Sequence, residues 1–284
     1  MLEVVASIHE LRRHVGARRQ SGASIGFVPT MGALHAGHAR LLERARAECN
    51  EVVVSVFVNP LQFDRREDLE RYPRAIDADV ALCRQLGVDT VFAPSVEEMY
   101  PVPPDCEVEV RRLADHLCGA YRPGHFRGVA TVVLKLFQIV QPDVAYFGEK
   151  DAQQLAVVRR LVTDLNVPVR IVGVETVRDD DGLALSSRNQ RLSADERRLA
   201  PCLYRALRAA AAAIESGVTR TSAIAERARA EIPDNPALRL EYLEVVDPDN
   251  MQPLARVAGP VVVAGALWVG NTRLIDNVYS GSGR

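Results

Sequence analysis

Residues 25–49 read IGFVPTMGALHAGHARLLERARAEC, and this stretch decides the predicted fold. Ile25–Val28 is apolar, as in a short buried strand. We expect the strand to end at Pro29, which has no N–H to donate to a neighbouring strand. Gly32 and Gly37 allow the backbone to turn tightly and to approach a ligand closely. The first half of the stretch therefore predicts a strand followed by a tight turn.

The second half predicts an amphipathic helix that starts near His38. Apolar residues recur there at helical spacing, at Leu41, Leu42, Ala45 and Cys49. A helix that starts at the carboxyl end of a parallel strand presents unpaired N–H groups and the positive end of its dipole, which favour phosphate. We therefore expect an anion site at this turn.

His35 and His38 lie three residues apart in HAGH, so both could face that anion. Histidine donates to phosphate oxygens and stabilises the charge that develops in phosphoryl or nucleotidyl transfer. Two alternatives stay open. The pair could be surface or packing histidines, or it could bind a metal. The zinc helix motif, however, spaces its histidines by four around a Glu, and no third ligand is near in sequence.

Composition bounds the class of protein. The 284 residues suggest one large domain or two smaller ones. Lys plus Arg number 35 against 37 Asp plus Glu, a net charge of −2, so we do not expect a nucleic-acid partner. Five cysteines without a CxxC pair argue against a disulfide framework or a zinc ribbon and fit a reducing cytoplasm. With no signal pattern and no apolar run of about 18 residues, neither secretion nor a membrane span is expected.

The rest of the chain alternates between strand and helix patterns up to about residue 176. Further buried strands are predicted at 51–58, 90–93, 143–147 and 168–174, and helices at 7–20, 74–87 and 122–137. The last of these helices is apolar nearly all round and could lie in a subunit interface. Residues 1–176 thus predict an α/β domain with a Rossmann-like parallel sheet.

Residues 177–284 predict a smaller α+β domain. Helices are expected at 194–215 and 221–231, and strands of a small antiparallel sheet at 238–246 and 261–269. Ser193 and Glu196 form an S-x-x-E capping box, which predicts a helix start at residue 193.

Polar residues follow the predicted strands at their carboxyl ends, where open α/β sheets bind ligands. Asn59 and Gln62 follow the second strand, although Asn-Pro also starts ordinary loops. Gly148 permits a turn after the fourth strand, where Lys150 could neutralise a triphosphate or be an exposed turn lysine. Asp151 could cap the helix that follows.

Three further polar groups fit the same picture. Gln153 and Gln154 open one helix, and only one of them can face the cleft. Asp79 lies near the start of the helix at 74–87 and could be a dipole partner only. The Ser-Ser-Arg run at 186–188 could be a polar loop, and it could also supply two hydroxyls and a guanidinium to a polyphosphate.

HxGH after a Gly-bearing turn resembles the HIGH signature of the adenylyltransferase superfamily, whose members bind ATP on a Rossmann-like sheet. Four longer strings resemble the pantothenate synthetase (pantoate:beta-alanine ligase) family and span essentially the whole chain. They are PTMGALHAGH at 29–38, NPLQF at 59–63, GEKDAQQL at 148–155 and GLALSSRN at 182–189.

The resemblance implies a cytoplasmic, homodimeric enzyme that uses ATP and Mg²⁺ to join pantoate to beta-alanine. Pantothenate would form through a pantoyl adenylate, with release of AMP and pyrophosphate, under a closing C-terminal lid at 177–284. The implied catalytic residues are His35, His38, Lys150 and Arg188. The implied ATP contacts are Met31, Gly32, Ala33, Leu34, His35, Ala36, Gly37, His38, Gly148, Glu149, Lys150, Asp151, Val177, Leu185, Ser186, Ser187 and Arg188. Asn59, Gln62 and Gln154 would hold pantoate and beta-alanine, and Asp79 would contact the metal.

Two other functions keep the nucleotide site. One is an adenylyltransferase that moves AMP onto a phosphorylated acceptor, which would need a second cationic pocket. The other is a nucleotide-sensing regulator without catalysis, which the polar residues at three strand ends make a poorer fit.

Overall fold

The computed structural model describes residues 2–281 and divides the chain into two compact units. The first unit comprises Met1–Val110, Arg122–Glu149 and Val157–Glu175, and the second comprises Arg111–Tyr121, Lys150–Ala156 and Thr176–Arg284. The last crossing between the units falls at the predicted boundary near residue 176. Two earlier segments also belong to the second unit, and the two-domain assignment itself stays a prediction.

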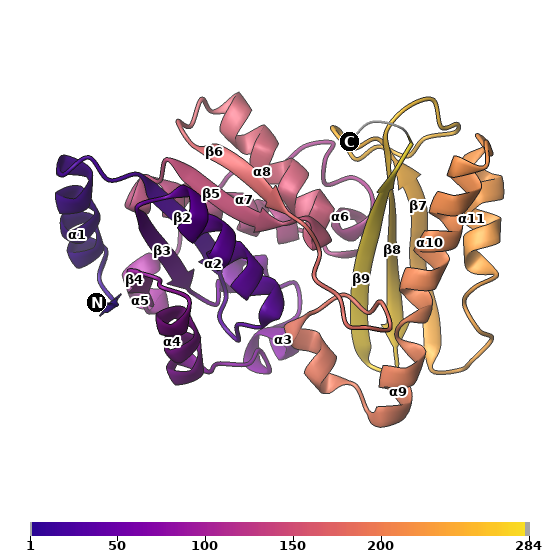
Figure 1. Cartoon of the computed structure of the whole chain (residues 1–284), viewed down its shortest axis with the longest axis horizontal. Helices are drawn as coiled ribbons and strands as arrows, with labels where there is room; N and C mark the ends of the chain where they lie inside the picture. Colours follow the sequence, from indigo (N-terminus) through magenta and orange to yellow (C-terminus); the bar gives the residue numbers. More distant parts are fainter. Residues whose placement is uncertain (1, 282–284) are drawn as a thin grey trace. The chain divides into compact units, whose positions relative to one another are not determined.

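The first unit contains a six-stranded parallel sheet in the order β1-β4-β3-β2-β5-β6 (Figure 1). This sheet confirms the predicted Rossmann-like fold class. Its strands are β1 (Glu3–Val5), β2 (Ile25–Thr30), β3 (Glu51–Val56), β4 (Thr90–Phe92), β5 (Val144–Gly148) and β6 (Arg170–Val174). The sequence did not predict β1, because this edge strand has three residues, too few to reveal a period of two.

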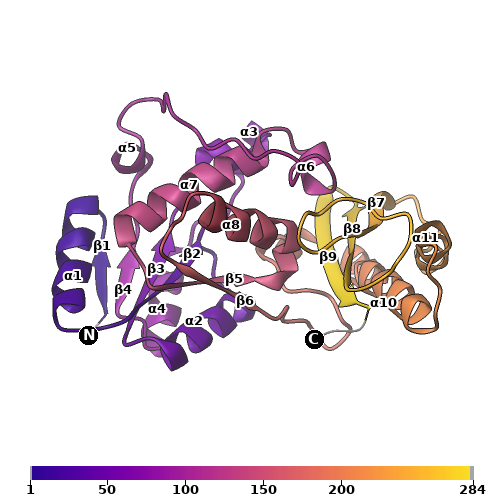
Figure 2. The ribbon, with the colours of Figure 1, turned by 90° about the horizontal axis from the view of Figure 1, so that it is seen from above.

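Helices cover both faces of this sheet, and Figure 2 shows α7 on one side with α2 and α4 on the other. Leu42 of α2 and Cys83 of α4 pack with Val54 in one core cluster. On the opposite face, Phe137 of α7 contacts Phe27 and Phe147 edge to face. The helices of this unit are α1 (Ile8–Gln20), α2 (Ala36–Glu48), α3 (Arg66–Glu70), α4 (Ile76–Gln85), α5 (Val96–Met99) and α7 (His125–Val140), with the short 3-10 turn η1 (Pro60–Gln62). The 3-10 turn η2 (Glu149–Asp151) and α8 (Ala152–Asp164) are divided between the two units.

The prediction that the central strand ends at Pro29 was wrong. β2 continues to Thr30, and Pro29 lies opposite Ser55 in the pairing with β3. Ile25 hydrogen-bonds toward β5 through its main chain, and alternate residues of a strand point their main-chain groups the same way. The missing N–H of Pro29 therefore points toward β5, whose pairing with β2 has already ended at Phe27. No ladder hydrogen bond is lost.

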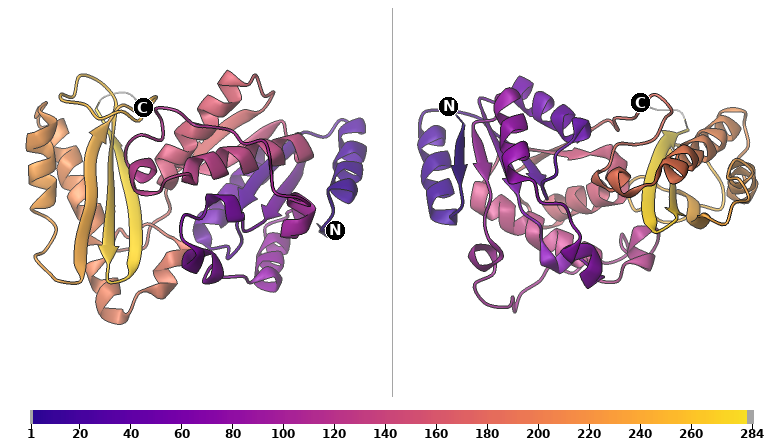
Figure 3. Two further views of the ribbon diagram at one scale, coloured as in Figure 1. Left: turned by 180° about the vertical axis from the view of Figure 1, so that it is seen from behind. Right: turned by 90° about the horizontal axis from the view of Figure 1, so that it is seen from below.

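The second unit is built on a three-stranded antiparallel sheet in the order β7-β8-β9. Its strands are β7 (Leu238–Val246), β8 (Val261–Val269) and β9 (Thr272–Ser280), and its helices are α6 (Cys118–Tyr121), α9 (Ala194–Leu199), α10 (Cys202–Glu215) and α11 (Thr221–Arg229), with the 3-10 turn η3 (Ser187–Arg191). Helices α10 and α11 pack on one face, seen as orange helices beside the yellow sheet in Figure 3. The predicted antiparallel sheet is confirmed, and β9 is an additional strand.

The predicted helix at 194–215 is wrong in one respect, because it is two helices. Pro201 is the N-cap of α10 and separates it from α9. A proline inside a helix would lose a hydrogen bond and clash with the preceding turn, so the chain starts a new helix there. The predicted capping box is present, with reciprocal bonds between Ser193 and Glu196.

Among the residues that the structure describes, no helix has both the length and the apolar character needed to cross a bilayer. All five cysteines are free thiols, and only Cys106 is exposed.

Candidate active site

The turn after β2 is anchored by a buried carboxylate. Gly32 adopts φ 82°, and a Cβ there would lie 2.9 Å from Asp79 Oδ2 and from Val56 Cγ1. Both oxygens of Asp79 accept main-chain N–H groups, from Ala33 at 2.9 Å and Leu34 at 2.7 Å. The side chain of Asp79 therefore fixes this turn from α4, and only glycine fits at position 32.

His35 and His38 form the cap of α2. The helix begins at Ala36, two residues before the predicted start, and His35 is its N-cap. His35 Nδ1 accepts the N–H of Gly37 at 3.1 Å, and His38 Nδ1 accepts the N–H of His35 at 3.3 Å. Because each Nδ1 is an acceptor, each ring is assigned its proton on Nε2, which is therefore a hydrogen-bond donor. Gly37 lies inside this helical turn and has no left-handed conformation, so the expectation that it makes the turn was wrong.

The NPLQF loop, residues 59–63, holds Gln62 beside the turn that follows β2. Asn59 is 1% exposed, and its Nδ2 donates to Gln62 Oε1 at 3.1 Å and to the carbonyl of Gly128 at 3.2 Å. Its Oδ1 accepts the hydroxyl of Tyr100 at 3.0 Å. Gln62 Nε2 in turn lies 3.2 Å from Met31 Sδ. Met31, a predicted ATP contact, is thus adjacent to Gln62, which is predicted to hold pantoate and beta-alanine. The buried Asn59 orients the side chain of Gln62.

Arg122 and His125 hold the main chain at Gln62, which the sequence did not predict. The guanidinium of Arg122 can only donate, so His125 Nε2, 3.1 Å from Arg122 Nη1, must accept. His125 Nδ1 then carries the proton and donates to the carbonyl of Gln62 at 2.8 Å, which also accepts from Arg122 Nη2. Arg122 is held by Asp64 at 3.0 Å. No local pattern links residue 125 to residue 62, so this contact needed the fold.

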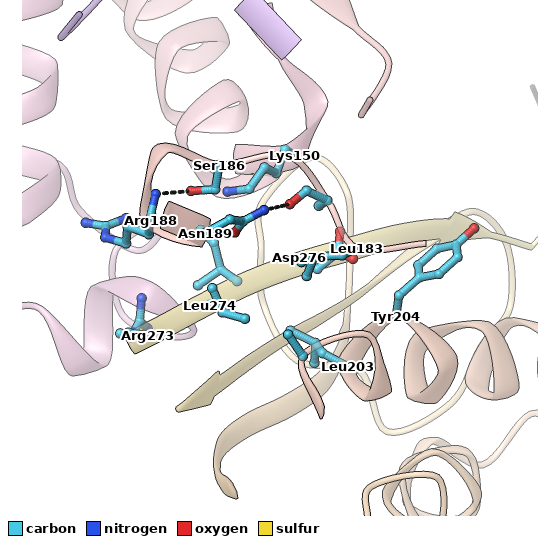
Figure 4. A pocket seen from close by; sticks show the side chains of 13 residues that line it. Lys150, Leu183, Ser186, Arg188, Asn189, Leu203, Tyr204, Arg273, Leu274 and Asp276 are labelled. Carbon is cyan, nitrogen blue, oxygen red and sulfur yellow. Dashed lines mark hydrogen bonds between the residues drawn. The ribbon is translucent and has the colours of Figure 1, made fainter. Parts of the chain in front are cut away.

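In the second unit, three predicted ATP contacts line one pocket (Figure 4). Lys150, Ser186 and Arg188 share it with Arg273 and Asp276. Ser186 Oγ accepts the N–H of Arg188 at 3.2 Å, which makes Ser186 the cap of η3. Two widely separated stretches of sequence therefore supply hydroxyl and cationic groups to one hollow.

The junction after β5 differs from the expected turn. Gly148 is the last residue of β5 and has no left-handed φ, so the turn does not require glycine. No atom lies within 4 Å of where its Cβ would be, so there is open space beside the backbone. Gln153 is the helix residue that faces inward, because its Nε2 donates to the carbonyls of Leu113 and His116. Gln154 is partly exposed, and its contact with a ligand stays a prediction.

The predicted site residues divide between the two units. The first unit contains Met31, Gly32, Ala33, Leu34, His35, Ala36, Gly37, His38, Asn59, Gln62, Asp79, Gly148 and Glu149. The second contains Lys150, Asp151, Gln154, Val177, Leu185, Ser186, Ser187 and Arg188. The meeting of the two sets on one nucleotide stays a prediction.

The described residues do not fit a resident metal. They contain no group of three or more His, Cys, Asp or Glu side chains that could hold an ion. Asp79 is 2% exposed and already accepts two N–H groups, whereas Mg²⁺ takes accessible oxygens and keeps several waters.

The fold and these junctions define a class of protein: a Rossmann-like α/β protein with an HxGH cap at the carboxyl end of an interior strand. A sequence profile described as Pantoate-beta-alanine ligase matches residues 3–279. The chain belongs to the pantoate-beta-alanine ligase family.

Similar proteins extend this result. The pantothenate synthetase of Moorella thermoacetica is 51% identical over 277 residues, which cover 98% of this chain and 98% of that protein. A crystal structure of pantothenate synthetase from Thermus thermophilus has a TM-score of 0.92 at 48% identity, covering 97% of this chain and 98% of that one. A Francisella tularensis ligase, described as complexed with beta-gamma ATP and beta-alanine, has a TM-score of 0.81 at 33% identity and covers 100% of this chain and 99% of that one.

Some relatives are longer. The bifunctional pantoate ligase/cytidylate kinase of Thermosynechococcus vestitus is 54% identical over 287 residues, and the match covers 96% of this chain but 55% of that protein. The chain thus spans about half of such bifunctional relatives.

Proposed function

We propose that the protein is an ATP-dependent ligase that joins pantoate to beta-alanine. The observation that carries the proposal is the HAGH cap, in which His35 and His38 turn Nδ1 toward the main chain and so place a protonated Nε2 at the start of α2, where anions are favoured. The family match and the ligands named for the Francisella tularensis ligase support the identity of the substrates.

The reaction has two steps and needs no enzyme nucleophile. A carboxylate oxygen of pantoate attacks the α-phosphorus of ATP, and the bond to the β,γ-pyrophosphate breaks. The free amine of beta-alanine then attacks the acyl carbon of the pantoyl adenylate, AMP leaves, and the amine loses its proton. The products are pantothenate, AMP and pyrophosphate.

Electrostatic stabilisation supplies the catalysis in this proposal. A carboxylate that approaches a triphosphate brings negative charges together, and His35, His38, Lys150 and Arg188 would offset that repulsion. Mg²⁺ is part of the substrate, as its ATP complex. Gln62 and Gln154 would hold pantoate and beta-alanine, and the buried Asn59 would act by orienting Gln62.

A homodimer in the cytoplasm is proposed on the family resemblance. The apolar residues of α7, apart from the partly exposed Leu134, are buried within their own chain, so they do not argue for a subunit interface. Sedimentation equilibrium tests the dimer, and a single species at the monomer mass would exclude it.

The decisive test is isotope exchange between pyrophosphate and ATP, with pantoate present and beta-alanine absent. Exchange that depends on pantoate demonstrates a reversible adenylate, and AMP should then form in quantity only after beta-alanine is added. Stable transfer of AMP to a phosphate ester would instead favour an adenylyltransferase. Binding of ATP with no turnover would favour a nucleotide sensor.

A further inference from the structure

The segment NTRLIDN, residues 271–277, contacts two parts of the second unit that carry predicted cations. One part is the segment at Lys150, and the other is the hairpin that precedes Ser186 and Arg188. Asp276 and Asn277 are adjacent on β9, and each is 5% exposed. Their side chains contact two chain segments that are far apart in sequence, one at Lys150 and one at the hairpin before Ser186.

Asn277 fixes the main chain at Lys150. Its Nδ2 donates to the carbonyl of Lys150 at 2.8 Å. Lys150 lies in η2, and its side chain lines the pocket that also contains Ser186 and Arg188. A buried amide that holds this carbonyl sets the point from which the ammonium group extends.

Asp276 fixes the hairpin that leads to Ser186. Its two carboxylate oxygens accept from the guanidinium of Arg178 at 2.6 and 2.9 Å. Arg178 also donates to the carbonyls of Gly182 and Asn277, and its guanidinium stacks 3.9 Å above the ring of Tyr204. The carboxylate of Asp276 binds both terminal nitrogens of the Arg178 guanidinium, and the ring of Tyr204 packs against its face, so the group is held rigidly.

The hairpin carries that constraint to the Ser-Ser-Arg run. This hairpin comprises residues 177–185, and the N–H of Leu185 closes it by donating to the carbonyl of Val177 at 2.9 Å. Asn189 then donates to the carbonyl of Ala184 at 3.0 Å, which folds η3 back onto the hairpin. One continuous set of hydrogen bonds therefore joins the segment of Lys150 to the segment of Arg188 through β9.

We infer that Asn277 is a positioning residue that sets the spacing of Lys150 from Ser186 and Arg188, with Asp276 and Arg178 as the other half of the same support. The inference rests on the proposed function, because it takes Lys150 and Arg188 to bind one triphosphate. Two cations from distant segments serve the same phosphates only if their spacing is fixed in advance, and a misplacement of about 1 Å can reduce the rate about a hundredfold.

The test replaces the donor and keeps its shape. Asn277→Asp puts an oxygen where Nδ2 was, against the carbonyl of Lys150. The KM for ATP should rise about tenfold, while the KM for pantoate stays within about twofold of the wild-type value. Val278→Ala is the matched control, because Val278 is the next residue of β9 and packs into the core of the second unit. It should lower the unfolding midpoint and leave the KM for ATP unchanged.

A double-mutant cycle with Lys150→Ala separates positioning from general damage. If Asn277 acts through Lys150, Asn277→Asp should change the dissociation constant of Mg·ATP by less than about twofold once Lys150 is alanine. An equal loss in both backgrounds would overturn the inference, as would a Val278→Ala effect on ATP of the same size.

The dissociation constant of Mg·ATP is measured by calorimetry, so the double-mutant cycle does not depend on whether the protein catalyses ligation. A wild-type protein that binds Mg·ATP but forms no AMP with pantoate and beta-alanine would refute the proposed function, and the cycle would still decide the role of Asn277. A wild-type protein that does not bind Mg·ATP would refute both.

Discussion

At the scale of single residues, His35 and His38 do two jobs with the two nitrogens of each ring. Nδ1 completes the cap of α2, and Nε2 carries the N–H that the proposed chemistry uses. A capping box usually uses Ser or Thr with Glu or Gln. An imidazole differs from these side chains because its acceptor and its donor lie on opposite sides of one rigid ring. The histidines thus combine the helix start with the chemistry.

The variant His38→Gln separates the capping role of this residue from its proposed role as a donor to the nucleotide. Glutamine at this position can still accept the N–H of His35, as in an ordinary capping box, but its amide donors sit on a flexible chain and are not preorganised as those of an imidazole are. We expect turnover to fall at least about a hundredfold, since one preorganised donor is worth about 3 kcal/mol, while the unfolding midpoint stays close to the wild-type value. His38→Ala should lose the same activity and also about 1 kcal/mol of stability. Near-normal turnover in both variants would refute the proposed role.

Asp79 belongs to the same scale, and its partners predict a structural effect. Asp79→Asn replaces one accepting oxygen by a donor, so the N–H of Ala33 or Leu34 loses its bond. We expect urea unfolding to show a loss of about 2 kcal/mol. The Mg²⁺ concentration for half-maximal rate should not change. A marked rise in that concentration would instead identify Asp79 as a metal contact.

At the scale of elements, α7 positions the NPLQF loop by close backbone approach. A Cβ on Gly128 would lie 2.2 Å from the carbonyl oxygen of Leu61, so only glycine lets α7 pack against η1. The carbonyl of Gly128 also accepts from Asn59. The position of Gln62 therefore depends on a residue of α7 that no substrate needs to touch.

Gly128→Ala should therefore push η1 away from α7. We expect a loss of about 1 to 3 kcal/mol in the free energy of unfolding and a raised KM for pantoate. Gly16→Ala in α1 is the control, since no atom lies within 4 Å of its Cβ position. That variant should gain up to about 1 kcal/mol without a change in KM. If Gly128→Ala leaves the KM for pantoate unchanged, the packing of α7 against η1 does not control how Gln62 binds pantoate.

The buried thiol of Cys83 and the partly buried phenol of Tyr100 predict how the stability of the first unit depends on alkaline pH. Burial, followed by the charge of Asp79, raises the pKa of Cys83 from 9.0 to about 12. Burial, followed by the charge of Glu107, raises the pKa of Tyr100 from 10.0 to about 12. In this range the folded state holds protons that the unfolded chain has released, so the free energy of unfolding must fall as pH rises from 9 to 12. Urea midpoints across that window should decline, and less steeply in Tyr100→Phe.

At the scale of the whole molecule, the predicted cations belong to two compact units. His35 and His38 lie in the first, and Lys150 and Arg188 lie in the second. An acyl adenylate is a mixed anhydride that water destroys, so the proposed chemistry requires a site that closes.

We accordingly expect ATP to bring the two units closer together. Small-angle scattering should give a smaller radius of gyration with a non-hydrolysable ATP analogue, and hydrogen exchange should slow around Ser186–Arg188. Lys150→Ala, measured at the same analogue concentration, should show a weaker change. Identical scattering with and without a saturating analogue would argue against closure.

The sequence by itself determined the alternation of strands and helices, the HAGH junction, the capping box at Ser193 and the strings that define the family. These features are local, because apolar spacing and capping chemistry act over a few neighbouring residues. Tertiary structure alone decided the rest. Pro29 stays within β2 because its missing N–H falls where the pairing with β5 has ended, and Asp79 serves the turn at Ala33 because α4 packs beside it. Such contacts join residues far apart in the chain, and their geometry exists only once the sheet and its helices have assembled.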